Sequence, residues 1–194
     1  ERRTRQMAIQ CGEPGPFAQI AGAIDQALWD MSARRAGLPL WKHLGGQNEV
    51  RVYASGIGPD DVVTAALRKH REGFDAFKLK VGFGTARDRA NFAAMRAAVG
   101  DDATIMADAN QAWSSEEATE RILELAEFRP HWVEEPIAAD EPPSAWRMLA
   151  TKCGVPLAAG ENLRGQQAFD DAVDAGYLKF IQPDVGKWGG ISGG

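Results

Sequence analysis

Residues 76–82 read AFKLKVG, which places two lysines within an apolar run. Successive side chains of an extended strand point to opposite faces, so Lys78 and Lys80 share one face while Phe77, Leu79 and Val81 share the other. Two ammonium groups close together inside a protein are costly unless anionic groups lie nearby. The lysine pair therefore predicts a charged site with carboxylates facing it.

Carboxylates do recur at the ends of later apolar runs. Asp108, Glu134 and Glu161 follow one another at nearly equal intervals, and Asp184 ends the next run. One acid at such a position is usually a turn residue or a helix cap, but the repetition favours a shared role. Since hard oxygen ligands suit Mg²⁺, we expect Asp108, Glu134 and Glu161 to hold one magnesium ion.

The elements that must position these residues alternate regularly along the chain. Six apolar runs of strand character occupy residues 51–55, 76–81, 104–109, 131–135, 156–161 and 178–184. Segments with helical periodicity lie between them, at residues 60–72, 86–99, 115–128, 143–153 and 167–175. Ser114 and Glu117 form an S-x-x-E capping box at the start of one of these helices.

Strand alternating with helix predicts an α/β fold with a parallel sheet, and the uniform order favours a TIM-type barrel over a doubly wound sheet. In such a barrel the chemistry lies at the carboxyl ends of the strands, where the lysines and acids fall. A barrel of this kind closes with eight strands. We therefore expect an incomplete barrel with its sixth strand at an edge, belonging to a longer polypeptide.

Composition excludes several other classes of protein. Among 194 residues, Asp and Glu outnumber Lys and Arg by 27 to 22, so a nucleic-acid partner is not expected. Cys11 and Cys153 stand in unrelated contexts, which predicts reduced thiols and neither a disulfide framework nor a zinc site. No apolar run approaches the ~20 residues of a membrane span, and the N-terminus is charged. We expect a cytoplasmic protein without a membrane partner.

One glycine pattern and three histidines are not expected to take part in the chemistry. The sequence GFG at 82–84 opens a G-x-G-x-x-G pattern, but Arg87 stands at the third glycine position, so dinucleotide binding is not expected. His43, His70 and His131 lie in helical stretches or at the beginning of a strand, where a structural or solvated role is expected.

Five segments also carry a family resemblance: FKLKVG, ADANQAW, WVEEPI, AAGEN and IQPDVGKWGG. In order and spacing they resemble the successive barrel motifs of the enolase superfamily, specifically its mandelate racemase branch. The muconate-lactonizing branch has a lysine where this chain has Asp184, and usually an aspartate where it has Glu161. The sequence is thus similar to the racemase and acid-sugar dehydratase branch.

The resemblance extends to the N-terminal part, because AIDQALWDMSARRAGLPLWKHLGG is similar to the segment that links the family's capping domain to its barrel. It implies that residues 1–48 are the end of an N-terminal α+β capping domain with its linker helix. Residues 49–194 would then form barrel strands one to six. We also expect a homo-oligomer.

The resemblance further implies roles for individual residues. Lys80 takes the position of the general base, and Lys78 that of a charged partner that binds the substrate carboxylate. Two nearby positive charges, Mg²⁺ and Lys78, favour the neutral form of Lys80 that a base must have. Asn110 and Asn162 would bind substrate. Asp184 would act as an acid–base residue with a histidine of a seventh strand, which this chain does not contain.

The reaction implied is Mg²⁺-dependent removal of the α-proton of a small-molecule carboxylate, through an enediolate intermediate. Dehydration of an acid sugar is the favoured outcome, because a site of this polarity suits a polyol carboxylate. Racemisation or epimerisation of an α-hydroxy acid stays open as an alternative. So does a non-catalytic barrel relative that keeps a metal ion for stability.

Overall fold

The computed structural model describes residues 14–194. Its contacts divide the chain into two compact units. Of the described residues, one unit contains 14–51, 160–174 and 182–194, and the other contains 52–159 and 175–181. None of the described helices is both long and apolar enough to cross a membrane.

The second unit carries one parallel sheet of six strands. The strands are β1 (Ala54–Ile57), β2 (Ala76–Lys80), β3 (Thr104–Asp108), β4 (Val133–Glu134), β5 (Leu157–Ala159) and β6 (Phe180–Ile181). Each strand pairs with the next one along the chain, so β1 and β6 lie at the two edges. The expected succession of barrel-type βα units, with the sixth strand at an edge, is confirmed.

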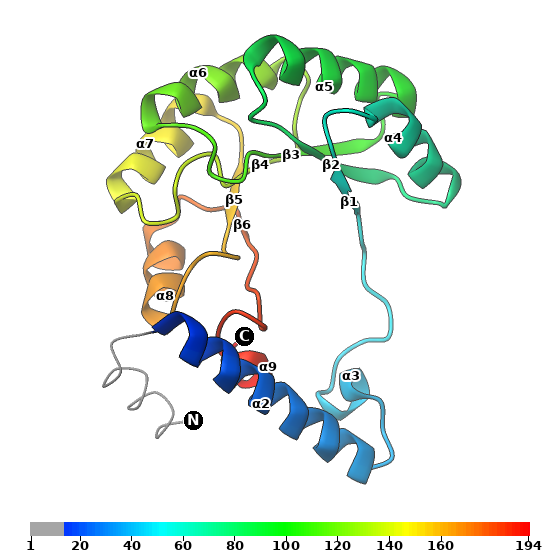
Figure 1. Ribbon diagram of the computed structural model, residues 1–194, viewed down its shortest axis with the longest axis vertical. Helices are drawn as coiled ribbons and strands as arrows, with labels where there is room; N and C mark the ends of the chain where they lie inside the picture. The colour runs from blue at the N-terminus through cyan, green and yellow to red at the C-terminus, as the bar shows by residue number, and fades with distance from the viewer. Residues whose placement is uncertain (1–13) are drawn as a thin grey trace. The chain divides into compact units, whose positions relative to one another are not determined.

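Four helices alternate with these strands and lie along one face of the sheet (Figure 1). They are α4 (Val62–Arg71), α5 (Thr85–Val99), α6 (Ser115–Ala126) and α7 (Pro143–Cys153). Phe77 and Leu79 of β2 are fully buried, as are Phe92 of α5 and Ile122 of α6. Burying such side chains stabilises the unit by about 1.5–3 kcal/mol each.

The predicted capping box at the start of α6 is confirmed. The hydroxyl of Ser114 accepts a hydrogen bond from the N–H of Glu117, and the carboxylate of Glu117 accepts one from the N–H of Ser114. Each bond satisfies a backbone N–H near the helix terminus. The helix therefore begins at Ser115, where the sequence predicts it.

The predicted span of the first strand is wrong. The sequence predicts residues 51–55, whereas β1 runs from Ala54 to Ile57. Its pairing with β2 shifts register between these two residues, where Gly56 adopts φ 73°. A glycine accepts this left-handed conformation at little cost, so the strand continues past a position at which the apolar pattern breaks.

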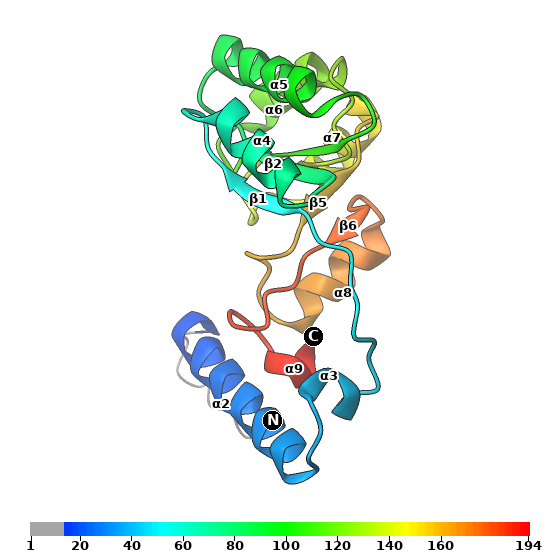
Figure 2. The same ribbon diagram turned by 90° about the vertical axis from the view of Figure 1, so that its right-hand side faces the viewer.

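The first unit contains α2 (Pro14–Arg35), α3 (Leu40–His43), α8 (Gln166–Ala175) except its last residue, and α9 (Gly190–Gly193). Both views place α9 beside α2 (Figures 1 and 2). Asp25 of α2 accepts hydrogen bonds from the N–H and the hydroxyl of Ser192. The linker segment that begins at Ala23 is thus helical as far as Arg35.

Candidate active site

The face of the sheet opposite the helices carries charged side chains at the carboxyl ends of β2, β3 and β4. Lys80 is the register partner of Asp108, and Asp108 is the register partner of Glu134. Register partners point to the same face, so the three side chains form one row across three strands. Asp108 and Glu134 are 1% and 2% exposed. Two buried carboxylates therefore lie side by side and require positive charge nearby.

Lys78 supplies part of that charge. Its Nζ donates to Oε1 and Oε2 of Glu134 at 2.6 and 2.8 Å, and it lies 3.3 Å from Oδ2 of Asp108. The ring of Tyr53 lies 5.5 Å from the same ammonium group. One cation thus occupies the point where the two carboxylates converge.

Lys80 serves the outer end of the row. Its Nζ donates to Oδ2 of Asp108 at 2.6 Å and to Oδ1 of Asn110 at 2.5 Å. The N–H of Asn110 in turn donates to Oδ1 of Asp108. Unlike Lys78, the side chain of Lys80 is 30% exposed, so this lysine can meet a ligand that approaches from solvent.

The pKa directions fit a network of full charges. Burial alone would lower the pKa of Lys78, but the hydrogen bond and charge of Glu134, with the charge of Asp108, raise it above 10.5. Burial would raise the pKa of Asp108, but the hydrogen bond from Lys80 and the charges of both lysines hold it below 3.8. Both groups are therefore ionised at neutral pH.

An apolar cluster lies on the same face of the sheet as the charged row. Met106, Trp132 and Ala158 are buried there, with Tyr53 and Phe180 packed against them. Trp132 Nε1 donates to Oε2 of Glu134 at 3.4 Å. Neither Tyr53 nor Trp132 is predicted from the sequence to be a site residue. The alternation of strand faces could have identified Trp132, because it stands two residues before Glu134 and shares its face.

The other predicted site residues belong to the other unit. Glu161, Asn162 and Asp184 lie there around Lys187. Lys187 Nζ donates to Oδ1 of Asn162 at 3.2 Å and lies 3.6 Å from Oε1 of Glu161. Asp184 Oδ1 accepts the N–H groups of Gly186 and Lys187. The turn that follows Asp184 is thus closed by hydrogen bonds to the Asp184 side chain itself.

Within residues 14–194, no three His, Cys, Asp or Glu side chains are gathered in a group that could hold a metal ion. The structure brings together two of the three predicted ligands, Asp108 and Glu134. Their buried oxygens already surround one cation, the ammonium of Lys78, and hard oxygen donors of this kind fit Mg²⁺. The addition of Glu161 to this pair, and the roles assigned to the site residues, stay predictions.

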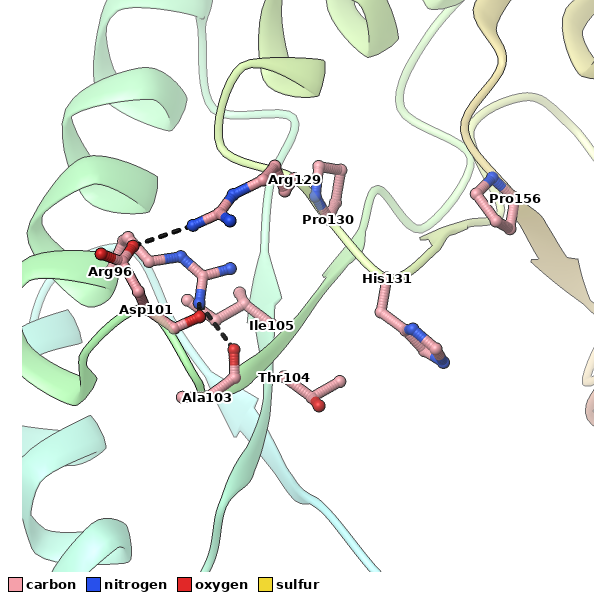
Figure 3. Close-up of a pocket in the computed structure, with 9 residues that line it drawn as sticks. All are labelled: Arg96, Asp101, Ala103, Thr104, Ile105, Arg129, Pro130, His131 and Pro156. Carbon is pink, nitrogen blue, oxygen red and sulfur yellow. Dashed lines mark hydrogen bonds and ion pairs between the residues drawn. The ribbon is translucent and has the colours of Figure 1, made fainter.

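A cavity of about 420 Å³ lies at the amino ends of β3, β4 and β5, away from the carboxyl ends that carry the charged row (Figure 3). Its lining includes two cationic side chains, Arg96 and Arg129. Arg96 donates to four backbone carbonyls, those of Gly100, Asp101, Ala103 and Phe128. Arg129 pairs with the carboxylate of Asp101. Because these guanidinium groups are engaged in holding loops, this cavity is not the candidate site.

Both parts of the chain match known protein families. Residues 61–194 match the family described as "Enolase C-terminal domain-like". Residues 3–45 match the family described as "Mandelate racemase / muconate lactonizing enzyme, N-terminal domain".

Two curated relatives are enzymes named for sugar acids. The chain is 38% identical over 187 residues to a 3,6-anhydro-alpha-L-galactonate cycloisomerase of Streptomyces coelicolor, covering 93% of this chain and 52% of the relative. It is 36% identical over 188 residues to an L-talarate/galactarate dehydratase of Salmonella typhimurium, covering 93% and 47%. The chain therefore spans about half the length of the curated relatives it matches.

Solved structures agree with this relationship. A mandelate racemase/muconate lactonizing enzyme from Bordetella bronchiseptica is 48% identical with a TM-score of 0.93, covering 99% of this chain and 53% of that one. An enolase from Bradyrhizobium, complexed with magnesium and mandelic acid, is 33% identical with a TM-score of 0.90, covering 99% and 54%. The chain belongs to the mandelate racemase and muconate lactonizing enzyme family of the enolase superfamily.

Proposed function

We propose that this chain carries much of the active site of a Mg²⁺-dependent enzyme that removes the α-proton of a carboxylate substrate. The observation that carries the proposal is the convergence of Asp108 and Glu134 on one ammonium group, with a second lysine beside them. Two lysines and two buried carboxylates at one place are not needed for stability, because well-packed apolar side chains of similar volume are often at least as stabilising. This group of charges suits a site that must bind a cation and an anion together.

Asp108, Glu134 and Glu161 would hold the metal ion. When bound, Mg²⁺ would supply positive charge to the carboxylate of the substrate. Lys78, whose pKa is raised, stays protonated and contributes a second fixed positive charge for the same carboxylate. Binding energy is thereby directed to the group that gains negative charge in the reaction.

Lys80 would remove the proton. Its Nζ is held by Asp108 and Asn110, and deprotonation of this ammonium leaves a lone pair to accept the proton of the substrate α-carbon. Loss of that proton converts the substrate to an enediolate. Asp184, acting with a histidine from elsewhere in the full-length protein, would return a proton or protonate a departing hydroxyl group.

The first of these two outcomes is racemisation and the second is dehydration. The names of the two curated relatives both refer to acids derived from galactose or its isomers, and one of them is a dehydratase. We therefore favour dehydration of an acid sugar. Racemisation of an α-hydroxy acid is the second candidate, supported by the mandelic acid bound in the Bradyrhizobium structure.

The test uses the full-length protein and a panel of acid sugars and α-hydroxy acids in D₂O. NMR would follow exchange of the α-proton, with Mg²⁺ present or with a chelator. We expect exchange and loss of water for at least one acid sugar, and neither in chelator. Turnover that chelation leaves unchanged would contradict the metal-dependent reaction. Magnesium binding with no exchange on any substrate would support the non-catalytic alternative.

A further inference from the structure

The loops that follow β3 and β4 contain an unusual concentration of left-handed backbone. Asn110, Gln111 and Glu135 have φ angles of 44°, 63° and 41°, and only Arg129 among the other described non-glycine residues has a positive φ. This conformation costs a non-glycine residue about 1 kcal/mol or more, so it persists only where the surroundings hold it. All three residues lie within three positions of Asp108 or Glu134.

Contacts between Gln111 and Glu135 hold these loops together. The N–H of Gln111 donates to the carbonyl of Glu135 at 2.7 Å. Gln111 Nε2 donates to Oε2 of Glu135 at 3.1 Å, and Gln111 Oε1 accepts the N–H of Ala139 at 3.0 Å. The carboxylate of Glu135 is buried, with the residue 1% exposed. The Gln111 side chain therefore spans from a buried carboxylate to the loop backbone beyond it.

This connection matters because the sheet itself is short at this point. β4 contains only Val133 and Glu134, and its last pairing with β3 joins Glu134 to Asp108. Beyond that pairing, the N–H of Ala109 donates to the carbonyl of Glu134, and the next link is the pair of bonds from Gln111 to Glu135. Past this pairing, the ends of β3 and β4 are thus held together by contacts that lie outside the regular strands.

We infer that Gln111 and Glu135 form a strut that fixes the spacing of Asp108 and Glu134, which makes Gln111 a positioning residue for the metal site. The inference rests on the proposed function, because it assigns the strut to magnesium binding. Partners that orient metal ligands typically change metal affinity by about 10- to 100-fold when they are lost. Gln111 itself has no ligand role, since its amide is occupied at both ends.

A charge exchange tests the strut. Gln111→Glu sets two carboxylates at the place of the 3.1 Å bond, and we expect calorimetry of the full-length protein to give Mg²⁺ binding weakened by about 10- to 100-fold. The double variant Gln111→Glu with Glu135→Gln rebuilds the bond with donor and acceptor reversed. We expect it to return the affinity to within about threefold of the original, as coupled residues in a double-mutant cycle do.

The matched control is Gln167→Glu, the same change on the exposed surface of α8, where Gln167 donates to Asp171. Mg²⁺ affinity should be unaltered in this variant. Melting temperatures would be compared for all variants, because a purely structural fault would lower the melting temperature without the rescue of metal affinity in the double variant. Unchanged affinity in Gln111→Glu, or no recovery in the double variant, would overturn the inference.

A second readout separates the strut from the proposed function. Hydrogen exchange of residues 104–113 and 132–137 in metal-free protein reports directly on how firmly the two strand ends are held. We expect faster exchange in Gln111→Glu and recovery in the double variant. If the unchanged protein binds no Mg²⁺, the proposed function fails while the exchange data still decide on the strut. Equal exchange rates in all variants would exclude the strut, whether or not the protein binds Mg²⁺.

Discussion

Lys80 Nζ lies 2.6 Å from Oδ2 of Asp108, so the proposed base and a proposed metal ligand form an ion pair. In the proposed mechanism a metal ion bound by Asp108 would compete with Lys80 for this carboxylate and leave the lysine free to act as the base. Metal binding and the action of the base would then be linked through this one contact.

Lys80→Met should abolish exchange of the substrate α-proton on the face that Lys80 serves, by at least about 100-fold, because no base remains there. Mg²⁺ affinity should be equal or higher, since Asp108 no longer has to leave an ion pair. NMR in D₂O measures the exchange and calorimetry the affinity, with the exposed Lys179→Met as control. Exchange at the original rate would place the base elsewhere.

Lys78→Met should destabilise the metal-free protein by about 3–5 kcal/mol, because it removes the ammonium that bonds both oxygens of buried Glu134. Chemical denaturation measures the loss. Added Mg²⁺ should stabilise this variant more than the original protein, since the metal ion then balances the negative charge of Asp108 and Glu134 in place of the ammonium group.

The control for that experiment is Lys69→Met, which removes an exposed ion pair with Glu72 and should cost about 1 kcal/mol or less. A loss in Lys78→Met no larger than in this control would mean that the carboxylates do not depend on the lysine for their charge balance.

Ser114→Ala should lower the free energy of unfolding by about 1 kcal/mol, because the N–H of Glu117 loses its acceptor at the beginning of α6. Ser144→Ala is the matched control, since Ser144 is exposed near the start of α7. Urea denaturation of both variants measures their free energies of unfolding. Equal stabilities would show that the capping box contributes nothing measurable.

Cys153 should react slowly with thiol reagents. Burial raises the pKa of its thiol above 9.0, although the charge of Lys152 opposes the shift. In a Cys11→Ser background, the rate of reaction with a disulfide reagent at pH 8 should rise steeply on unfolding. A rate equal to that of a free thiol in the native protein would contradict burial of the group.

The same raised pKa sets a direction for stability. The folded protein binds the thiol proton more tightly than the unfolded chain, so this contribution is complete below pH 9.0 and is lost as the pH rises through the folded-state value. Comparison of the unfolding free energies of Cys153→Ala and its parent at pH 8 and above pH 10 isolates the contribution of the thiol proton. The stability difference between the two proteins should shrink at the higher pH.

Much of this fold follows from sequence pattern because its elements are strongly periodic. Residues 143–153 are predicted as a helix and form one over the same span, since their apolar spacing and the proline at the start agree. The row of Lys80, Asp108 and Glu134 was also predictable, because parallel strands bring their carboxyl ends to one edge.

Other features depend on information that a single segment does not contain. Helix α9 lies in a glycine-rich stretch without apolar periodicity, and it is held by contacts with α2, far away in the chain. The link between Gln111 and Glu135 likewise arises from left-handed backbone at two separate strand ends, which residue type alone does not predict. Such features are set by tertiary contacts and not by local preference.

The spatial order of the six strands is the same as their order in the chain. Each strand therefore finds its partner in the strand synthesised immediately before it, with one helix between them. As the polypeptide leaves the ribosome, the sheet can grow by one βα unit at a time, with β1 at one open edge and the newest strand at the other. The rate at which successive units are translated would then set how long each new edge stays open to other chains.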